Sequence, residues 1–242
     1  MAPPDPTLAA IVLAGGAGTR LGLDGGRNKV YLPLGGLPIL AWSLRTLDPL
    51  VVPGGLVVVV RAGDEDEARD AIGAAGTTRE PLVVAGGATR TASEAAGIAS
   101  LRPLLETGRI DVVLVHDGAR PFASSALVRR LAVAARDRGA AIPALPPQPG
   151  TVAVDADGTL RPVDPTRLRR VQTPQAIRTA ELLAAYDLAA RDGIEGADTA
   201  EVVAACEGPP AVVVDGEVDN VKVTTPEDVD LADAIAARLA SG

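Results

Sequence analysis

A glycine-rich loop directly after an apolar run is the feature that most constrains what this chain can fold into. Residues 8–13, LAAIVL, have the length and content of a buried parallel strand. Three glycines follow within residues 15–18, where the backbone can turn sharply and approach a ligand closely. Successive backbone N–H groups in such a loop form a concave site for an anion. Because two cations, Arg20 and Lys29, stand just downstream, the segment predicts a loop that wraps a nucleoside triphosphate.

The spacing of this loop excludes the two commonest phosphate-binding fingerprints. A P-loop needs Gly-x-x-x-x-Gly-Lys-Ser/Thr, but Arg20 stands five residues after Gly15 and the chain has no Gly-Lys pair. The dinucleotide-binding pattern Gly-x-Gly-x-x-Gly requires a glycine where this chain has Leu21. A strand-to-helix turn whose glycines serve geometry alone remains the alternative, and the two cations downstream disfavour it.

The distribution of lysine points to the same loop. Of the 23 lysines and arginines only Lys29 and Lys222 are lysines, and the abundance of Ala, Gly, Pro and Arg indicates a bias toward arginine. A lysine kept against that bias favours a site that needs a compact, mobile ammonium group. Two surface lysines left by chance are the alternative. Their neighbours disfavour it, because Lys29 follows the glycine loop and Lys222 lies in the apolar pattern DNVKV, which predicts a strand over residues 221–223.

Composition limits the class of protein and its partners. The 242 residues, 47% of them hydrophobic, suffice for one large α/β domain. A formal net charge of −8 disfavours nucleic acid as a partner. The single Cys206 excludes an internal disulfide, and no Cys/His cluster suits zinc. The N-terminus lacks signal-peptide features, and no segment approaches the roughly 20 apolar residues of a membrane span. We therefore expect a cytoplasmic protein without a membrane partner.

Alternating strand-like and helix-like segments predict the fold class. Short apolar runs bounded by Gly, Asp or Pro predict strands at residues 57–60, 82–85, 112–115 and 211–214. Helical spacing predicts helices at residues 64–72, 89–105, 124–138 and 178–191, and a last helix capped at Thr225 with Pro226 in its first turn. Asp64 and Thr89 are the expected N-caps. The alternation predicts a Rossmann-like, mostly parallel sheet with helices on both faces, formed by a single domain over residues 1–242.

The pattern changes between residues 140 and 171. Short alternating runs are interrupted there by several prolines, and VAVDADGTLRPV predicts a β-hairpin with a tight turn at Asp157–Gly158. We expect residues 140–171 to form an arm that projects from the sheet. A proline-flanked hairpin of this length cannot bury itself on its own sheet and needs a partner surface.

Three segments at the ends of predicted strands contain the residues that are suited to ligand binding and catalysis. They are AGGAGTR, AGGATRTAS and HDGARPF, at residues 14–20, 85–93 and 116–122. Ligands of open parallel sheets bind beyond the carboxyl ends of the strands, so the three segments predict one shared site rather than three capped helix starts. The only histidine, His116, is interpreted as a hydrogen-bonded residue at a strand end and not as a general base. No Ser–His–Asp or Cys–His system is discernible, which disfavours acyl-transfer chemistry.

At this point the motifs resemble a known family, the 2-C-methyl-D-erythritol 4-phosphate cytidylyltransferases. The resemblance runs nearly end to end and keeps the order of the motifs. They are the glycine loop with Arg20, Lys29, GG-x-x-R-x-x-S at residues 86–93, HDGARP at 116–121, QTPQ at 172–175 and DNVKVTTPED at 219–228. The resemblance implies a nucleotide-diphospho-sugar transferase type of fold and a homodimer joined by the arm. It also implies transfer of CMP from CTP to 2-C-methyl-D-erythritol 4-phosphate with Mg²⁺, giving 4-diphosphocytidyl-2-C-methyl-D-erythritol and pyrophosphate.

The resemblance also implies roles for individual residues. Arg20 and Lys29 would contact the triphosphate and stabilise the transition state, and Lys222 would orient the substrate phosphate and the α-phosphate. The phosphates would be cradled by Ala14, Gly15, Gly16, Ala17 and Gly18, and the cytosine and ribose held by Gly86, Gly87, Ala88 and Ser93. Contacts to the sugar phosphate are expected from Asp117, Arg120, Thr151 and Thr173, with Asp117 also expected near the Mg²⁺ ion.

Two positions depart from the family pattern. The usual Asp-Thr pair near the start of the arm is Gly150–Thr151, which keeps the threonine and loses the carboxylate. The family arginine eight residues before the threonine of Thr-Pro-Gln is Pro165 here. Arg167, two residues on, can point to the same face of an extended strand and is our candidate for the substrate phosphate, with Arg161 as a weaker substitute.

Three alternative functions stay open from the sequence. The departure at Pro165 keeps open a cytidylyltransferase for ribitol 5-phosphate or another sugar-alcohol phosphate, or another nucleotidyltransferase of similar fold. A nicotinamide-dependent reductase would need Tyr-x-x-x-Lys, but Tyr31 is followed at that spacing by Gly35 and Tyr186 by Ala190. A non-catalytic nucleotide-binding subunit is disfavoured because both lysines are retained.

Overall fold

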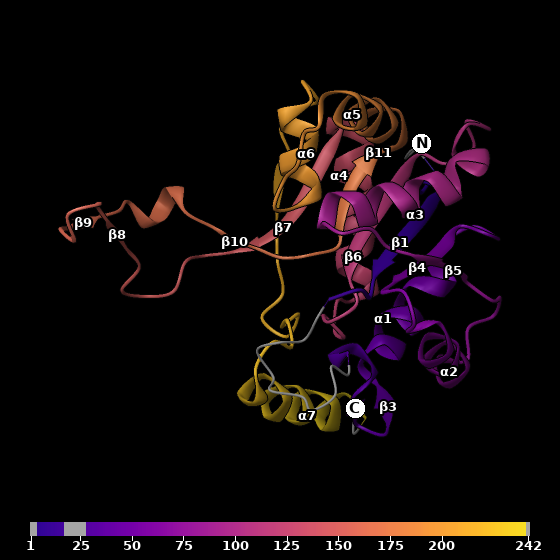
Figure 1. The fold of residues 1–242 in the computed structure, drawn as a ribbon. Coiled ribbons are helices and arrows are strands. Elements are labelled where there is room, and N and C mark those ends of the chain that lie inside the picture. The colour runs from indigo at the N-terminus through magenta and orange to yellow at the C-terminus, as the bar shows by residue number, and fades with distance from the viewer. Residues whose placement is uncertain (1–3, 17–27, 241–242) are drawn as a thin grey trace.

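An eight-stranded sheet organises the part of the chain that the computed structural model describes, residues 4–16 and 28–240 (Figure 1). Along the sheet the strands run β10, β7, β11, β6, β1, β4 and β5, and β12 pairs with β7. Their bounds are β1 (Leu8–Leu13), β4 (Leu56–Val60), β5 (Leu82–Ala85), β6 (Val112–Asp117), β7 (Ala140–Leu145), β10 (Arg170–Val171), β11 (Gln175–Arg178) and β12 (Val212–Asp215).

The core of the sheet is parallel, as the sequence predicts. Strand β1 pairs in parallel with both β4 and β6, and β4 pairs in parallel with β5. Strand β11 runs antiparallel to β6 and to β7. The ends of β1 and β6 are level, because Leu13 is paired with Asp117. Their carboxyl ends therefore meet at one edge of the sheet.

Helices cover both faces, and alternate residues of β1 explain why. Ala10 and Val12 belong to a core that includes residues of α1 (Ile39–Leu47), α2 (Glu65–Ala75) and α4 (Ser125–Arg138). Ala9 and Ile11 point into the opposite core, with residues of α3 (Arg90–Leu105), α5 (Thr179–Asp192) and α6 (Thr199–Ala205). The period of two along a strand thus divides the apolar residues between two helical layers. The predicted Rossmann-like fold class is confirmed.

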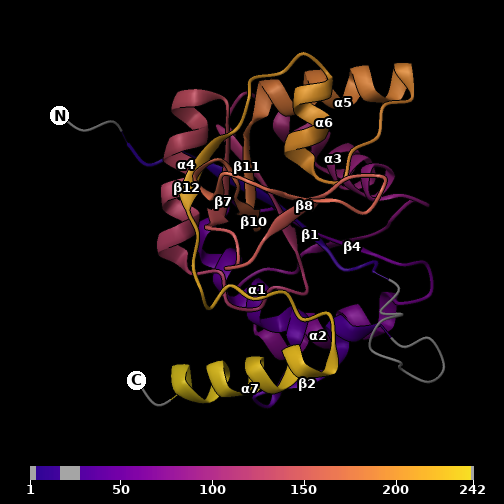
Figure 2. The same cartoon turned by 90° about the vertical axis from the view of Figure 1, so that its left-hand side faces the viewer.

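A third, smaller core lies beside the sheet. It joins α7 (Pro226–Ala240) to residues around the small strands β2 (Pro33–Leu34) and β3 (Leu37–Pro38), and Figure 2 shows α7 set apart from the strands of the main sheet. Its members are Leu34, Ile39, Phe122, Val223, Ala232, Ile235 and Ala236. The predicted strand over residues 221–223 is wrong. Residues 221–223 have no regular secondary structure. Val223 instead donates its N–H to the Ala119 carbonyl, and its side chain is buried in this third core.

The arm projects from the sheet, but it is shorter than the sequence predicts. Residues 140–145 form β7, which is paired on both sides within the main sheet, and β10 returns along β7 at the base of the arm. The antiparallel hairpin of β8 (Val152–Val154) and β9 (Leu160–Pro162) lies far out on the projection (Figure 1). The sequence pattern places β7 in the arm because its alternation with Pro143 resembles that of an isolated hairpin strand.

Of the two N-caps predicted for α2 and α3, Thr89 makes the capping bond and Asp64 does not. Thr89 and Ser124 accept N–H groups at the starts of α3 and α4 through their side-chain oxygens. Asp64 stands at the N-cap of α2 without a capping bond from its side chain. Its carboxylate accepts from Arg61 and Asn28 instead. Among the described residues, no helix combines the length and apolarity that crossing a membrane requires.

Candidate active site

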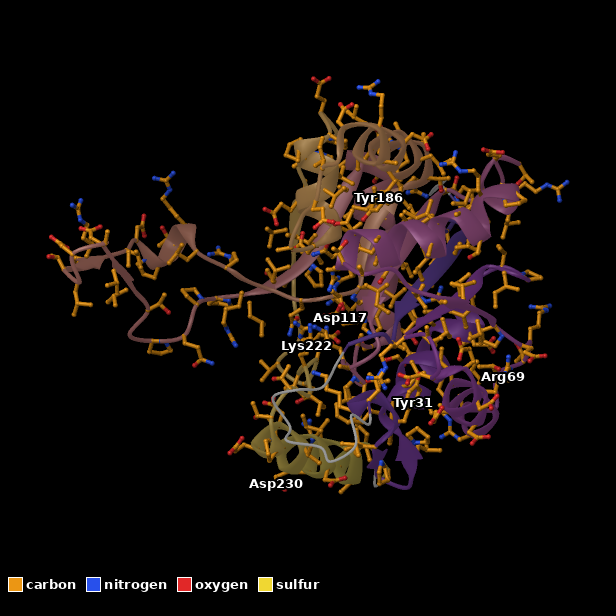
Figure 3. The ribbon with its side chains drawn as sticks, in the orientation of Figure 1. Tyr31, Arg69, Asp117, Tyr186, Lys222 and Asp230 are labelled. Atoms are coloured by element: carbon orange, nitrogen blue, oxygen red, sulfur yellow. The ribbon has the colours of Figure 1, made fainter. Side chains whose placement is uncertain are left out.

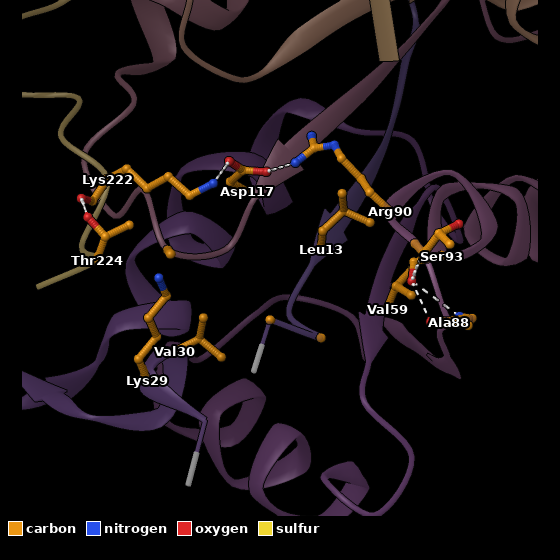
Figure 4. Close-up of a pocket in the computed structure, with 15 residues that line it drawn as sticks. Leu13, Lys29, Val30, Val59, Ala88, Arg90, Ser93, Asp117, Lys222 and Thr224 are labelled. Atoms are coloured by element: carbon orange, nitrogen blue, oxygen red, sulfur yellow. Dashed lines mark hydrogen bonds and ion pairs between the residues drawn. The ribbon is translucent and has the colours of Figure 1, made fainter. Parts of the chain in front are cut away.

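A cavity of about 440 Å³ opens at the edge where β1 and β6 end (Figure 4). It brings together segments far apart in the sequence. Its lining consists of Leu13, Gly15, Gly16, Lys29, Val30, Val59, Gly87, Ala88, Thr89, Arg90, Ser93, Asp117, Ala119, Lys222 and Thr224. The three strand-end segments and both lysines of the chain therefore face one space. Their grouping agrees with the shared site predicted from the sequence.

Asp117 is the electrostatic centre of the cavity. The Lys222 Nζ atom lies 2.7 Å from Asp117 Oδ2, and the Arg90 Nη1 atom lies 2.8 Å from Asp117 Oδ1. Figure 3 shows Asp117 and Lys222 facing each other between the sheet and α7. Burial alone would raise the pKa of this carboxyl, but the charges of Arg90 and Lys222 hold it well below its usual range. Asp117 is therefore a carboxylate at neutral pH, held between two cations.

Lys29 is held at the cavity by its neighbour Asn28. The buried Asn28 amide donates to the Ala14 carbonyl at the end of β1 and, at 3.0 Å, to Asp64 Oδ2. Its carbonyl oxygen accepts from Val30 N and so caps the short 3₁₀ helix η3 (Lys29–Tyr31). The lysine side chain is only 8% exposed. Sequence reasoning missed Asn28, although a capping residue directly before Lys29 was a signal for it.

The paired glycines after β5 are required by packing. A Cβ atom on Gly86 would lie 2.7 Å from Ser93 Oγ, and one on Gly87 would lie 2.5 Å from the Ala92 Cβ atom. Ser93 Oγ donates to the Thr89 carbonyl and accepts from Gly87 N. Side chains at the glycines would therefore push α3 away from the end of β5. Gly87 lines the cavity, whereas Gly86 does not.

Arg120 and Thr173 lie beside Asp117 and not on the cavity lining. The Arg120 guanidinium donates to the carbonyls of Asn220 at 2.9 Å and Val171 at 3.4 Å. Thr173 Oγ1 accepts the Asp117 N–H at 3.0 Å. These contacts tie the segments that follow β6, β10 and β12 to one another. The predicted contacts of both side chains with substrate stay predictions.

His116 is a structural residue, as the sequence interpretation holds. It is fully buried, its Nδ1 atom lies 3.1 Å from Thr173 Oγ1, and its Nε2 atom lies 3.0 Å from the Arg120 carbonyl. A carbonyl only accepts, so Nε2 carries the proton and Thr173 donates to Nδ1. Burial lowers the pKa of His116 to about 4. The ring is therefore neutral at pH 7.

This depressed pKa makes stability depend on pH. Between its ordinary pKa of 6.5 and its folded value of about 4, His116 binds a proton only in the unfolded chain, so stability falls as pH falls through that window. The loss is roughly 3 kcal/mol of the free energy of unfolding. Urea denaturation at pH 7 and pH 4 should show this extra loss in the parent and not in His116→Gln. Carboxyl groups titrate in both proteins, so equal pH dependence in the two would contradict the assignment.

The remaining predicted residues lie elsewhere. Ala14 is buried at the end of β1, and its N–H bonds to the Val59 carbonyl. Thr151 and Arg167 are exposed on the arm, which leads away from the main sheet of its own chain (Figure 1). The predicted residues Ala17, Gly18 and Arg20 lie outside the described part of the chain.

The described residues do not form a divalent-cation site by themselves. Residues 4–16 and 28–240 contain no group of three or more His, Cys, Asp or Glu side chains placed to hold a metal ion. Asp117 is the carboxylate on the cavity lining, and both of its oxygens are already paired with Lys222 and Arg90. Magnesium is usually held by one or two carboxylates together with substrate phosphates. Among the described residues of the lining, Asp117 is therefore the side chain that could help to hold the ion beside a bound nucleotide.

Comparison with known proteins identifies the family. The family model "2-C-methyl-D-erythritol 4-phosphate cytidylyltransferase" matches residues 8–238. The protein of that name from Geobacter metallireducens is 36% identical over 93% of this chain and 95% of its own length. The one from Thermus thermophilus is 37% identical over 95% of this chain and 97% of its own length.

Solved structures agree. The 2-C-methyl-D-erythritol 4-phosphate cytidylyltransferase of Thermus thermophilus superposes with a TM-score of 0.71 at 32% identity, over 96% of this chain and 99% of that one. The 4-diphosphocytidyl-2C-methyl-D-erythritol synthase of Anaerococcus prevotii gives a TM-score of 0.79 at 26% identity over the same shares. With sequence motifs, fold and cavity in agreement, the chain belongs to the 2-C-methyl-D-erythritol 4-phosphate cytidylyltransferase family.

Proposed function

We propose that the cavity catalyses transfer of the cytidylyl group of CTP to 2-C-methyl-D-erythritol 4-phosphate, the activity for which the family is named. The observation that carries the proposal is the meeting of Lys29 and Lys222, the chain's only lysines, on one cavity lined by the glycines after β1 and β5. A phosphate oxygen of the sugar phosphate attacks the α-phosphorus of CTP. The bond from that phosphorus to the oxygen bridging to the β-phosphate breaks, and pyrophosphate leaves with its electron pair.

The protein's contribution to this step is electrostatic. A phosphate monoester is already anionic near neutral pH, so its attack needs no strong base. The barrier comes from bringing two polyanions together and from the charge that develops on the phosphorus oxygens. Lys29 stabilises that charge together with Arg20, and Lys222 orients the attacking phosphate against the α-phosphate. The neutral, fully bonded His116 has no part in proton transfer.

In this proposal the divalent cation would bind together with the nucleotide. Among the described residues that line the cavity, Asp117 is the carboxylate that could help to hold Mg²⁺, and the ion would supply positive charge that offsets the charge of the triphosphate. Because the proposed reaction uses CTP, we expect a cytoplasmic location.

The nucleotide pocket is expected to prefer CTP. Gly87, Ala88 and Ser93, which have no side chain or a small one, line this part of the cavity, and fixed amide and carbonyl groups of such a segment can read the edge of a pyrimidine. Pyrophosphate release with CTP, UTP, ATP and GTP at equal concentrations checks this expectation. Equal turnover with purine triphosphates would contradict it. The same assay with ribitol 5-phosphate in place of the methylerythritol phosphate separates the two cytidylyltransferase functions, and we expect turnover with the latter.

The arm completes the site of a second copy of the chain. Its hairpin exposes Val154 by 62% and Leu160 by 65%, which is apolar surface suited to a partner. Of the four arginines within residues 161–170, all of them described, only Arg167 has a guanidinium without a hydrogen bond or ion pair in this chain; the others are paired with Asp155 or with backbone carbonyls. Arg167 and Thr151 therefore reach the sugar phosphate bound by the partner subunit in a two-fold homodimer.

A further inference from the structure

A chain of ion pairs runs from the cavity into the protein interior. Lys222 Nζ lies 2.7 Å from Asp117, and the other oxygen of Asp117 lies 2.8 Å from Arg90 Nη1. On its far side, Arg90 Nε lies 2.9 Å from Glu94 Oε1. The four charges alternate in sign along this line (Figure 4 shows the cavity end). Each group is thus held by an opposite charge on at least one side.

Residues of three helices hold the inner end of this chain of ion pairs. The side chain of Glu94, one turn after Arg90 on α3, is 1% exposed. Thr199 Oγ1 of α6 donates to it at 2.9 Å, and the Tyr186 hydroxyl of α5 donates to its second oxygen. None of these three side chains lines the cavity. Glu94 is therefore a buried, fully hydrogen-bonded carboxylate placed to hold the guanidinium of Arg90.

The Arg90 guanidinium depends on the two carboxylates for its orientation. Its Nη2 atom is buried and has no hydrogen-bond partner, so the contacts to Glu94 and Asp117 are its side-chain hydrogen bonds. Charge-assisted hydrogen bonds of this kind fix a planar guanidinium strongly. If the contact to Glu94 were lost, Arg90 could rotate, and Asp117 would lose a directed partner. Lys222, which is 37% exposed, would then be less restrained.

We infer that Glu94 and Arg90 are positioning residues for the transfer reaction, acting through Asp117 to place the ammonium group of Lys222 against the reacting phosphates. This inference rests on the role proposed for Lys222. Glu94 touches neither the cavity nor any group that reacts. In this proposal the effect of Glu94 on turnover passes through Arg90 and Asp117 to Lys222. Substitution of Glu94 should therefore have little further effect once the Lys222 side chain is removed.

A double-mutant cycle tests this route. Glu94→Gln should lower kcat roughly 10- to 100-fold, because a misplacement of about 1 Å at a reacting group has an effect of that size. In a Lys222→Ala background the same substitution should lower kcat less than about twofold further, since residues that act through one another are not additive. In a Lys29→Ala background its full effect should remain, because Lys29 is outside the chain of ion pairs.

The chain offers a matched control on the same helix. Arg102 in the last turn of α3 and Glu106 at its C-cap form another ion pair four residues apart, with the Glu106 side chain 58% exposed, so Glu106→Gln should leave kcat unchanged. If Glu94→Gln does not fold, Tyr186→Phe replaces it, since that change removes one hydrogen bond to Glu94 and keeps the ion pair with Arg90. An equal fold-loss in the Lys222→Ala and Lys29→Ala backgrounds would overturn the inference, as would unchanged kcat in folded Glu94→Gln. Normal turnover of Lys222→Ala alone would instead refute the role proposed for Lys222.

Discussion

Replacing Lys29 or Lys222 by alanine is expected to lower kcat by about two to four orders of magnitude, the range for loss of one preorganised contact to charge that develops in phosphoryl transfer. Both side chains line the cavity between the ends of β1 and β6. Each supplies a full positive charge there, and no other lysine exists to replace it. Steady-state rates of pyrophosphate release at saturating CTP and sugar phosphate give the measurement.

Replacing Lys29 by arginine separates the effect of the positive charge from the effect of its geometry. Lys29→Arg should recover little of the lost rate, because a planar fork cannot take the place of a point donor on a side chain that is only 8% exposed. Circular dichroism and the midpoint of thermal unfolding control for folding. A folded alanine variant with near-parental kcat would remove that lysine from the mechanism.

Mixed dimers are expected to restore activity that neither damaged chain has alone. Arg167→Ala should raise KM for the sugar phosphate about 10- to 100-fold, the loss expected for one charge-assisted contact, and leave KM for CTP nearly unchanged. A dimer of one Arg167→Ala chain and one Lys29→Ala chain has both lesions in one site and none in the other. Random mixing in equal amounts should therefore give roughly one quarter of the parental turnover, measured below the parental KM for the sugar phosphate.

Several results would contradict the shared site. A fully active monomer, or mixtures that stay as inactive as their components, would exclude a contribution of the arm to the partner's cavity. Unchanged kinetics of Arg167→Ala would transfer the role to Arg161, whose guanidinium is paired with Asp155. Mixing with subunits that carry Arg169→Ala serves as the control, since Arg169 donates to the Thr166 and Leu168 carbonyls of its own chain.

Most of the fold was predictable because its signals are local. The apolar run at residues 8–13, the cap Thr89 and the turn at Asp157–Gly158 each depend on a few neighbouring residues, and each is present in the structure. Strand β7 could not be separated from the arm because its partners β11 and β12 lie far along the sequence. The predicted strand at 221–223 failed for the related reason that Val223 packs against α7 instead of joining a sheet edge.

The candidate site shows the same division between residues that the sequence reveals and residues that it does not. The motifs pointed to Gly15, Gly16, Gly87, Lys29, Asp117 and Lys222, which lie on the cavity lining, and their contacts with substrate stay predictions. The supporting residues Asn28, Arg90 and Glu94 were not assigned roles. The contact of Asn28 with Asp64, and those of Glu94 with Tyr186 and Thr199, exist only after the helices have packed. A sequence pattern marks a charge near a cavity, but it does not reveal which buried group orients that charge.

The third core gives Lys222 an attachment different from that of the rest of the site. Val223, next to Lys222, packs in the cluster beneath α7, whereas Asp117 ends a strand of the main sheet and Val30, next to Lys29, packs in the main core. Small clusters of apolar side chains open more readily than the main core of a domain. Opening of this cluster alone would withdraw the ammonium group of Lys222 from the cavity while the two helical layers stayed packed. Heat or denaturant would then abolish activity before the main sheet and its helices unfold.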